Sequence, residues 1–320
     1  MRAAVRALLA ALTSVAVLLG AAGCAPSAPS WGGRAEVIAG GFTTGVYYDY
    51  GQQLAGVLSR ELPADVTVVE TDGSVDNLLR IGAGTATFGF AQSDAAADAI
   101  AGTGAFGEPL PIRAVARLYD EYVHVVVPAG SGIRSIADLK GRRISLGAAN
   151  SGVTVVARRV LEAAQVPEGS VDDAALGLDA SLRALKDGDV DAFFWVGGLP
   201  TPGIEQLAKE FPIRLLSIDS AVVDRINAAH DGVYRLAEFP VGAYGRDEPT
   251  VTMTVPNYLV TAADTPDELV RDVLASLFSA RAEIAKKVPA AALLDRRLAI
   301  FTDPIALHPG AEEYYSGTRR

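Results

Sequence analysis

The first residues in the chain that could do chemistry form a run of glycines and hydroxyls over residues 39–50, AGGFTTGVYYDY. Apolar Val37 and Ile38 precede this run, and a helical pattern follows it. The first N–H groups of a helix have no partner within the helix, and the helix dipole favours an anion there. The run therefore indicates a turn that can bind a carboxylate or a phosphate. Glycine-rich turns between a strand and a helix are also common in α/β domains, where most only reverse the chain.

Polar and aromatic side chains at three other places could contact a small ligand. Ser74 and Asn77 fall at a predicted helix start, where Ser74 either caps the helix or contacts the ligand. Gln92 ends a predicted strand, and its uncharged amide can bind an ammonium or a carboxylate. Trp195 lies near the end of another predicted strand and either walls a cleft or packs in the core. These side chains are candidates for binding a solute.

The sequence offers no catalytic or metal-binding set. The histidines, His124, His230 and His308, lie in separate segments without the paired spacing of a zinc motif. His124 alternates with valines and is predicted to be a buried core histidine, and His308 is predicted to belong to a structural turn. No Ser-His-Asp or Cys-His arrangement can be assembled, and the first turn lacks the lysine of a P-loop. We therefore expect no enzymatic activity and no cofactor.

Two arginines four residues apart, Arg113 and Arg117, lie on one face of a predicted strand. An arginine pair could clamp the carboxylate of a ligand. The alternative is that they pair with Asp120, Glu121 or Asp94 outside the cleft, and we favour this interpretation.

The N-terminal segment has the pattern of a secretory signal peptide over residues 1–23. Arg2 and Arg6 precede an apolar run at 7–19, which is shorter than the ~20 residues that span a bilayer. Residues 21–24, Ala-Ala-Gly-Cys, resemble a bacterial lipobox, although Ala21 stands where that motif prefers leucine. We therefore expect Cys24 to be lipidated and residues 24–34 to form a flexible tether. The protein would then be extracytoplasmic and lipid-anchored on the outer face of the cell membrane.

Composition and charge narrow the choice of partners. Cys24 is the only cysteine, so the chain cannot form an internal disulfide. The formal charge of −10 becomes −12 when residues 1–23, which hold two arginines and no acidic residue, are removed. Such a negative charge makes nucleic acid an unsuitable partner. The length of 320 residues, half of them hydrophobic, is enough for two lobes of ordinary size.

Apolar segments of strand length alternate with helical periodicity along the rest of the chain, which is typical of an α/β fold. The first group has predicted strands at 36–39, 65–70, 88–91 and 112–118, with helices ending at 62 and spanning 75–81. The second group has strands at 144–147, 190–196 and 213–218, with helices at 136–140, 153–164, 180–186 and 204–210. Long extended segments at 120–127 and 250–261 connect the groups, and residues 266–287 form a further helical stretch.

These two groups are predicted to form two lobes. Lobe 1 comprises residues 35–126 and 250–320, and lobe 2 comprises residues 127–249. Two extended crossings make a hinge with a cleft between the lobes. Open α/β sheets bind ligands beyond the carboxyl ends of their strands, so the glycine-rich strand ends of both lobes would face each other across this cleft.

Several short motifs occur in a fixed order between Glu36 and Gly317. They are Thr43-Thr-Gly-Val-Tyr47, Gly73-Ser74 with Asn77, Ala91-Gln-Ser-Asp94, Leu118-Tyr119 with Val123-His124, Asp138-Leu-Lys-Gly141, Asp191-Ala-Phe193, and Leu307-His-Pro-Gly-Ala311 with Tyr314-Tyr315. In this order they resemble the TAXI group of solute receptors, which serve TRAP-type secondary transporters. The resemblance implies a two-lobed periplasmic-binding-protein-like fold. It also implies a receptor without chemistry of its own, which closes on a glutamate-like amino acid or a dicarboxylate and delivers it to TRAP membrane subunits, here expected as a fused small and large subunit.

The resemblance also implies which residues bind the ligand. Lobe 1 would contribute Thr43, Thr44, Gly45, Tyr47, Ser74, Asn77, Gln92 and Ser93, and lobe 2 would contribute Ser151 and Gly152. The lobe 2 turn departs from the family pattern, because Asn150 replaces a glycine and Val153 replaces a threonine. The threonine would have added a hydroxyl at the helix start. Asn150 can supply an amide instead, so we add it and Trp195 to the expected ligand contacts.

Two other functions remain open at this point. The same binding site could serve a sensor kinase in place of a transporter. Less in keeping with the residues, a secreted enzyme could use the glycine-threonine turn to bind a phosphate.

Overall fold

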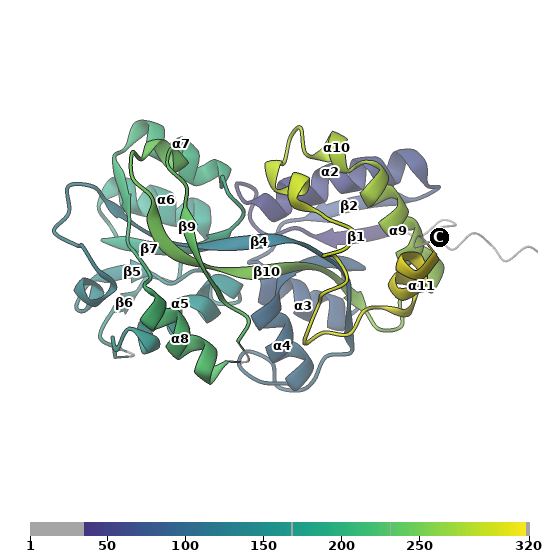
Figure 1. Cartoon of the computed structure of the whole chain (residues 1–320), viewed down its shortest axis with the longest axis horizontal. Coiled ribbons are helices and arrows are strands. Elements are labelled where there is room, and N and C mark those ends of the chain that lie inside the picture. The colour runs from purple at the N-terminus through teal and green to yellow at the C-terminus, as the bar shows by residue number, and fades with distance from the viewer. Residues whose placement is uncertain (1–34, 168, 231, 318–320) are drawn as a thin grey trace, which may run out of the picture.

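Two long strands, β4 (Ile112–Pro128) and β10 (Thr250–Ala262), run antiparallel through the middle of the molecule and take part in both of its halves (Figure 1). The computed structural model describes residues 35–167, 169–230 and 232–317. The signal peptide, the lipidated Cys24 and the tether that the sequence predicts therefore lie outside the described residues. Within them, no helix is both long and apolar enough to cross a membrane.

The strands of both halves form one ten-stranded sheet. Its strand order is β2-β1-β3-β10-β4-β7-β5-β6, and in addition β8 pairs with β4 and β9 pairs with β10. Strands β1, β2 and β3 are parallel to one another, and β5, β6 and β7 are parallel in the second half. Helices cover both faces of the sheet in each half (Figure 1). The fold is thus α/β, with the parallel strands buried between layers of helices.

The half called lobe 1 contains β1 (Ala35–Ala39), α2 (Val46–Glu61), β2 (Asp65–Val69), α3 (Ser74–Gly82), β3 (Phe88–Gln92) and α4 (Ser93–Ala101), and then α9 (Asp267–Ser279), α10 (Arg281–Ile284), η3 (Pro289–Leu293) and α11 (Pro309–Gly317). The apolar residues of α2 recur every three to four positions and face the sheet, which explains why this segment is helical. The C-terminal helices return to this half, where α9 and α10 lie beside α2 and α11 packs against α9 (Figure 1).

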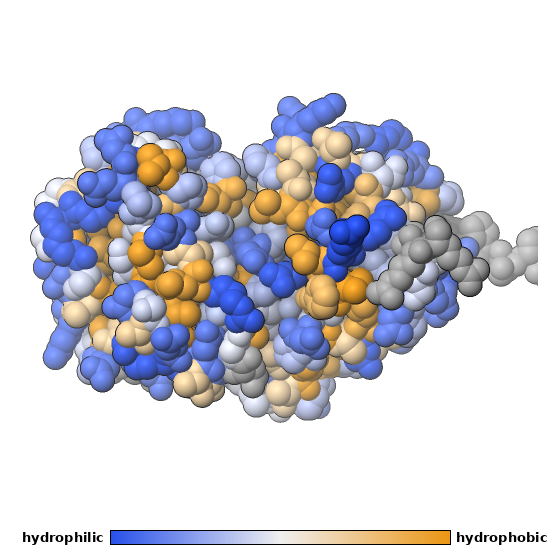
Figure 2. Space-filling model, viewed as in Figure 1, coloured by the Kyte–Doolittle hydropathy of each residue, from blue (hydrophilic) through white to orange (hydrophobic). Residues whose placement is uncertain are grey.

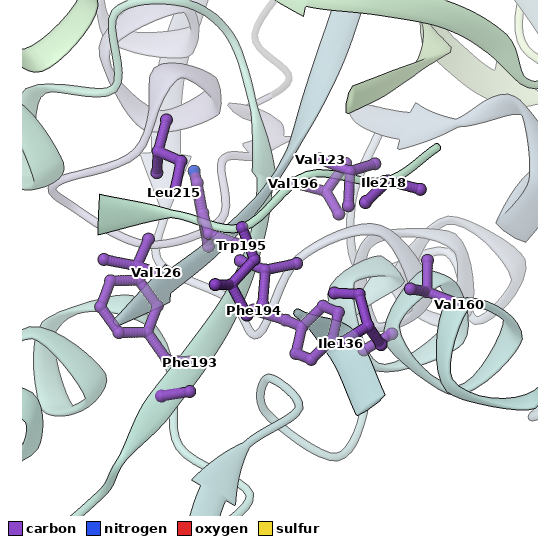
Figure 3. Packing of buried hydrophobic residues seen from close by; sticks show 14 of the residues in the cluster. Val123, Val126, Ile136, Val160, Phe193, Phe194, Trp195, Val196, Leu215 and Ile218 are labelled. Carbon is purple, nitrogen blue, oxygen red and sulfur yellow. The ribbon is translucent and has the colours of Figure 1, made fainter. Parts of the chain in front are cut away.

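The half called lobe 2 contains η1 (Ile136–Leu139), β5 (Arg143–Ser145), α5 (Gly152–Ala163), β6 (Asp172–Asp173), α6 (Leu178–Asp187), β7 (Ala192–Gly197), α7 (Pro202–Glu210), β8 (Ile213–Leu215), α8 (Ser220–Ala229), β9 (Arg235–Phe239) and η2 (Ala243–Gly245). Strand β7 is a continuous buried run, as expected for a strand covered on both faces. Figure 3 shows Val126 and Phe193 side by side, where β4 pairs with β7.

The buried hydrophobic residues separate along the same division. One cluster is built only from residues 123–255, and two others are built from residues 38–119 and 258–315. The exact lobe boundaries that the sequence predicts stay a prediction, because β4 and β10 run through both halves. On the surface, the face in Figure 2 is indented between the two halves at its upper edge.

Most predicted elements agree with the structure to within a few residues, but some expectations were wrong. The separate segments expected at 112–118 and 120–127 form one strand, β4. The sequence reasoning missed α4, α8 and β9. The alanine-rich sequence of α4 has little helical periodicity, since alanine fits on either face of a helix.

Candidate functional site

A small cavity of about 20 Å³ lies where turns from both lobes meet. The turns that follow β1, β2 and β3 contribute from lobe 1, and the α5 start and the end of β7 contribute from lobe 2. Its lining consists of Gly41, Phe42, Gly45, Val46, Tyr47, Asp72, Gly73, Ser74, Gln92, Glu121, Ser151, Gly152, Val153, Trp195, Val196 and Gly197. The volume is roughly that of one water molecule, so an amino-acid-sized solute can enter only if the lobes separate.

The lobe 1 wall is built from strand-to-helix turns that glycines shape. At Gly73 the backbone has φ of +111°, a conformation that favours glycine, and this residue stands immediately before α3. The structure thus puts Gly73, and not Ser74, at the capping position. The Ser74 hydroxyl instead accepts a hydrogen bond from the Gln92 backbone N–H at 3.2 Å. Ser74 thereby ties the start of α3 to the end of β3.

A buried carboxylate, Glu121 of β4, forms part of the cavity lining. Its side chain is 0% exposed, and it accepts hydrogen bonds from Gln92 Nε2 at 2.9 Å, the Tyr47 hydroxyl at 3.1 Å and the Tyr119 hydroxyl at 3.3 Å. Asn257 Nδ2 donates in turn to the Tyr47 hydroxyl at 2.6 Å. Burial raises the pKa of Glu121 from 4.5 to about 8, although the three hydrogen bonds lower it in part.

The lobe 2 wall consists of the start of α5 and the aromatic end of β7. Ser151 caps α5 by accepting a hydrogen bond from the Thr154 N–H at 3.2 Å. A Cβ atom at Gly152 would lie 2.2 Å from Gln92 Oε1, so only glycine allows the two lobes to approach this closely. Trp195 Nε1 donates to Thr201 Oγ1 at 3.0 Å, and its ring meets the edge of Phe42 with centroids 6.2 Å apart.

The structure brings seven of the predicted ligand contacts to this cavity. They are Gly45, Tyr47, Ser74, Gln92, Ser151, Gly152 and Trp195. Tyr47 rather than its neighbour Tyr48 lines the cavity, as the resemblance implied. Residues that lie far apart in the chain thus meet at one place.

The hydroxyls of Thr43 and Thr44 turn toward another part of lobe 2. Both donate hydrogen bonds to Asp179 on α6, and that from Thr43 measures 3.3 Å. The Asn150 carbonyl accepts from the Asp76 N–H at 3.0 Å, so it also joins the two lobes. These three residues contact the opposite lobe and do not line the cavity.

Asn77 and Ser93 are buried behind the cavity wall. Asn77 accepts from Thr71 Oγ1 at 2.6 Å and donates to the Phe90 carbonyl at 2.8 Å. These bonds hold the turn after β2 against β3. Asn77 therefore supports the wall of the cavity without lining it.

Sequence reasoning missed four residues of the lining that bear on recognition: Phe42, Asp72, Gly73 and Glu121. Glu121 was considered only as a partner for arginines outside the cleft. No local signal separated Glu121 from Arg113, Arg117 and Asp120, the other charged residues of the segment 112–127, which are only partly buried.

The predictions made for Arg117 and His124 agree with the structure. Arg117 pairs with Asp120 at 2.6 Å away from the cavity, as we favoured. Arg113 instead donates to the Ile112 carbonyl at 2.9 Å, and among the described residues it pairs with none of the three predicted carboxylates. His124 is a buried core histidine, with Nε2 at 2.8 Å from the Tyr244 hydroxyl and Nδ1 at 2.9 Å from the Tyr122 carbonyl. Burial lowers the pKa of His124 to about 3, so its ring is neutral at physiological pH.

A second contact between the lobes lies between α4 and α5. Arg159 of α5 reaches Asp94 Oδ2 at 3.2 Å and Asp98 Oδ2 at 2.9 Å on α4. The hydroxyl of Tyr234, in lobe 2, donates to Asp94 at 2.6 Å. Because Asp94 is buried, this ion pair is shielded from solvent and holds the two lobes together.

A larger hollow of about 820 Å³ lies on lobe 2 alone, beside α5. Its lining includes Arg158, Glu162 and Asp173. Because all of its lining residues belong to one lobe, closure of the lobes would not enclose a ligand there.

Comparisons with known proteins agree with this architecture. The sequence profile of the NMT1-like family matches residues 38–317. PhnD1 from Prochlorococcus marinus, solved in complex with methylphosphonate, has a TM-score of 0.54 at 12% identity, over 89% of this chain and 95% of that one. A candidate L-cystine ABC transporter protein from Listeria monocytogenes has a TM-score of 0.52 at 14% identity, over 82% and 98% of the two chains. The predicted two-lobed periplasmic-binding-protein-like fold is confirmed.

Proposed function

The chain belongs to the NMT1-like family, and from this premise we propose that it is an extracytoplasmic receptor that closes its two lobes on a small solute and delivers it to a membrane transporter. The observation that carries the proposal is the cavity formed jointly by the two lobes, next to the two strands that join them. A solute bound to one lobe gains contacts with the other only in the closed form. It therefore shifts the equilibrium between open and closed forms by its difference in affinity for them.

The solute that this site supports best is an amino acid or a small organic acid. The cavity lies at the starts of α3 and α5, where Ser74 and Gly152 line it. Helix N-termini favour a carboxylate through their N–H groups and their dipole. Seven predicted contacts meet there, and Thr43, Thr44 and Asn150 would act instead by holding the lobes together.

We further propose that the membrane partner is a TRAP-type transporter of the TAXI kind with a fused small and large subunit, and that lipidated Cys24 anchors the receptor beside it. The ordered motifs between Glu36 and Gly317 support this partner. Along the chain, the boundaries between the two lobes would fall at residues 126–127 and 249–250. A sensor kinase as partner would use the same site, and the genes adjacent to this one would distinguish the two: a fused multi-span subunit for the transporter, a histidine kinase for the sensor.

A thermal-shift measurement on the purified protein with amino acids and short carboxylates tests the proposal. A ligand at 100 times its Kd stabilises the folded state by about 2.7 kcal/mol, which raises Tm by ~5 °C or more in a protein of this size. X-ray scattering should show a smaller radius of gyration with the stabilising compound. If no compound raises Tm, the proposal for this solute class is wrong.

A further inference from the structure

Hydrogen-bond acceptors gather at the part of the cavity formed by lobe 1. Gln92 Oε1 is buried and has no hydrogen-bond partner among the described residues. The Gln92 side chain is 2% exposed, and this oxygen faces Gly152 across the cavity. Beside it lies the carboxylate of Glu121, which also lines the cavity. A buried acceptor without a partner costs free energy, so this region is suited to a ligand that donates hydrogen bonds.

Glu121 retains capacity for one more donor. A carboxylate has about four lone-pair positions. The protein uses three of them, through Gln92, Tyr47 and Tyr119. None of these three donors carries a positive charge, so the hydrogen bonds leave the charge of the carboxylate without a counter-charge.

The charges around the cavity also favour a ligand group that donates hydrogen bonds and carries a positive charge. Its acidic lining residues are Glu121 and Asp72, and within the described part of the chain no arginine or lysine lines it. Asp94 of α4 adds further negative potential at Glu121. A cation beside Glu121 would therefore be stabilised by the ionised carboxylate, whereas an anion there would be buried in a region of low dielectric without a counter-charge.

Two kinds of chemistry thus lie close together in the lining, since Gly152 and Ser74 at the helix starts adjoin Gln92. The starts of α3 and α5 favour a carboxylate, and Glu121 with Gln92 Oε1 favours an ammonium group. Building on the proposed receptor function, we propose that Glu121 binds the ammonium group of a zwitterionic amino acid, and that it is the residue by which the receptor excludes acids that lack an amine.

Matched pairs of compounds that differ only in the amine test this inference. The probes are L-glutamate with glutarate, L-leucine with isocaproate and L-alanine with propanoate, titrated calorimetrically into the purified full-length protein. The amino acid that binds best should bind ~100-fold more tightly than its partner acid, since a charged hydrogen bond and its ion pair are lost. Glu121→Gln should weaken that amino acid ~100-fold while changing the affinity of the partner acid less than tenfold.

Asp120→Asn is the matched control. It removes the same charge from the adjacent residue of β4, whose side chain pairs with Arg117 away from the cavity. It should leave the ratio of affinities unchanged. If Glu121→Gln fails to fold, proton release by the wild-type protein is measured instead. Calorimetry in buffers of different ionisation enthalpy should show that a proton is released when the amino acid binds near neutral pH. The reason is that the ammonium group stabilises the ionised form of the Glu121 carboxylate.

The outcomes separate the inference from the function on which it rests. An acid that binds as tightly as its amino acid would overturn the role of Glu121 and leave the receptor function standing. The role of Glu121 would also be overturned by a Glu121→Gln variant that folds and keeps wild-type affinities. The absence of proton release on binding would overturn it in the same way. If none of the six probes binds, the proposed function for this solute class and the inference fail together.

Discussion

Replacing Glu121 by glutamine should change how the stability of the unliganded protein depends on pH. In the folded protein burial holds the pKa of this carboxyl at about 8, against an ordinary value of 4.5. Between these two values the unfolded chain has lost the proton and the folded chain still holds it. Stability must therefore fall as pH rises through this window. Glutamine resembles the protonated carboxyl in shape and charge, and it does not titrate.

The size of the effect follows from the width of the window. About 3.5 pH units, between the ordinary value of 4.5 and about 8, at ~1.36 kcal/mol per unit correspond to on the order of 5 kcal/mol. We expect the variant and the wild type to have similar free energies of unfolding below the window. The variant should then become more stable than the wild type by several kcal/mol as pH rises to the top of it.

Urea unfolding of both proteins, at about pH 5 and about pH 8.5, measures this difference. The subtraction removes the contributions of titrating groups that do not interact with Glu121, including His124, whose pKa is lowered by burial. The free energy of unfolding of the Asp120→Asn variant should depend on pH in the same way as that of the wild type. Parallel curves for the Glu121→Gln variant and the wild type across this range would refute the argument that Glu121 is a buried, uncompensated carboxylate.

Two further predictions concern closure of the lobes. Arg159→Gln removes the cation between Asp94 and Asp98, which should favour the open form and weaken the best ligand about tenfold, with a larger radius of gyration in X-ray scattering. Lys186→Gln, which removes an exposed ion pair within lobe 2, should leave affinity unchanged, and an equal effect of both variants would contradict the role of Arg159. Gly152→Ala places a methyl group 2.2 Å from Gln92 Oε1 and should weaken ligand binding at least tenfold by calorimetry, with little change in Tm because the clash arises only on closure. Gly56→Ala on α2, where a methyl group meets nothing within 4 Å, is its control and should stabilise the folded protein by about 0.5–1 kcal/mol. Wild-type ligand affinity of the Gly152→Ala variant would show that the lobes do not meet at Gly152.

Much of the fold could be predicted because local patterns specify it. The alternation of apolar strands with helical periodicity identified an α/β chain, and β7 was recognisable as a continuous apolar run. Helix α4 was missed because its alanines give no periodicity. Strand β9 was missed because only Phe239 at its end is buried, so it shows no alternation of buried and exposed residues.

The candidate site could be predicted in part, since turns between strands and helices have a local sequence signature. Gly45, Ser74, Gln92 and Gly152 lie at such turns, and all four line the cavity. Thr43 and Thr44 occur in the same kind of turn but contact Asp179 instead. Local sequence indicates that a turn is present, but it does not determine which of its side chains face the cleft, because that depends on where the other lobe lies.

The sequence by itself determined the elements, the order of the two groups of strands and the turns that carry polar residues. Only the tertiary structure decided that Glu121 lines the cavity and that Arg159 joins the lobes. The physical reason is that helix and strand patterns arise from neighbours a few residues apart, whereas the environment of a charge arises from groups distant in sequence. Glu121 is surrounded by Tyr47, Gln92 and Tyr119 from three different elements. Its burial, and with it the charge of the ligand that it would bind, exists only once those elements have packed together.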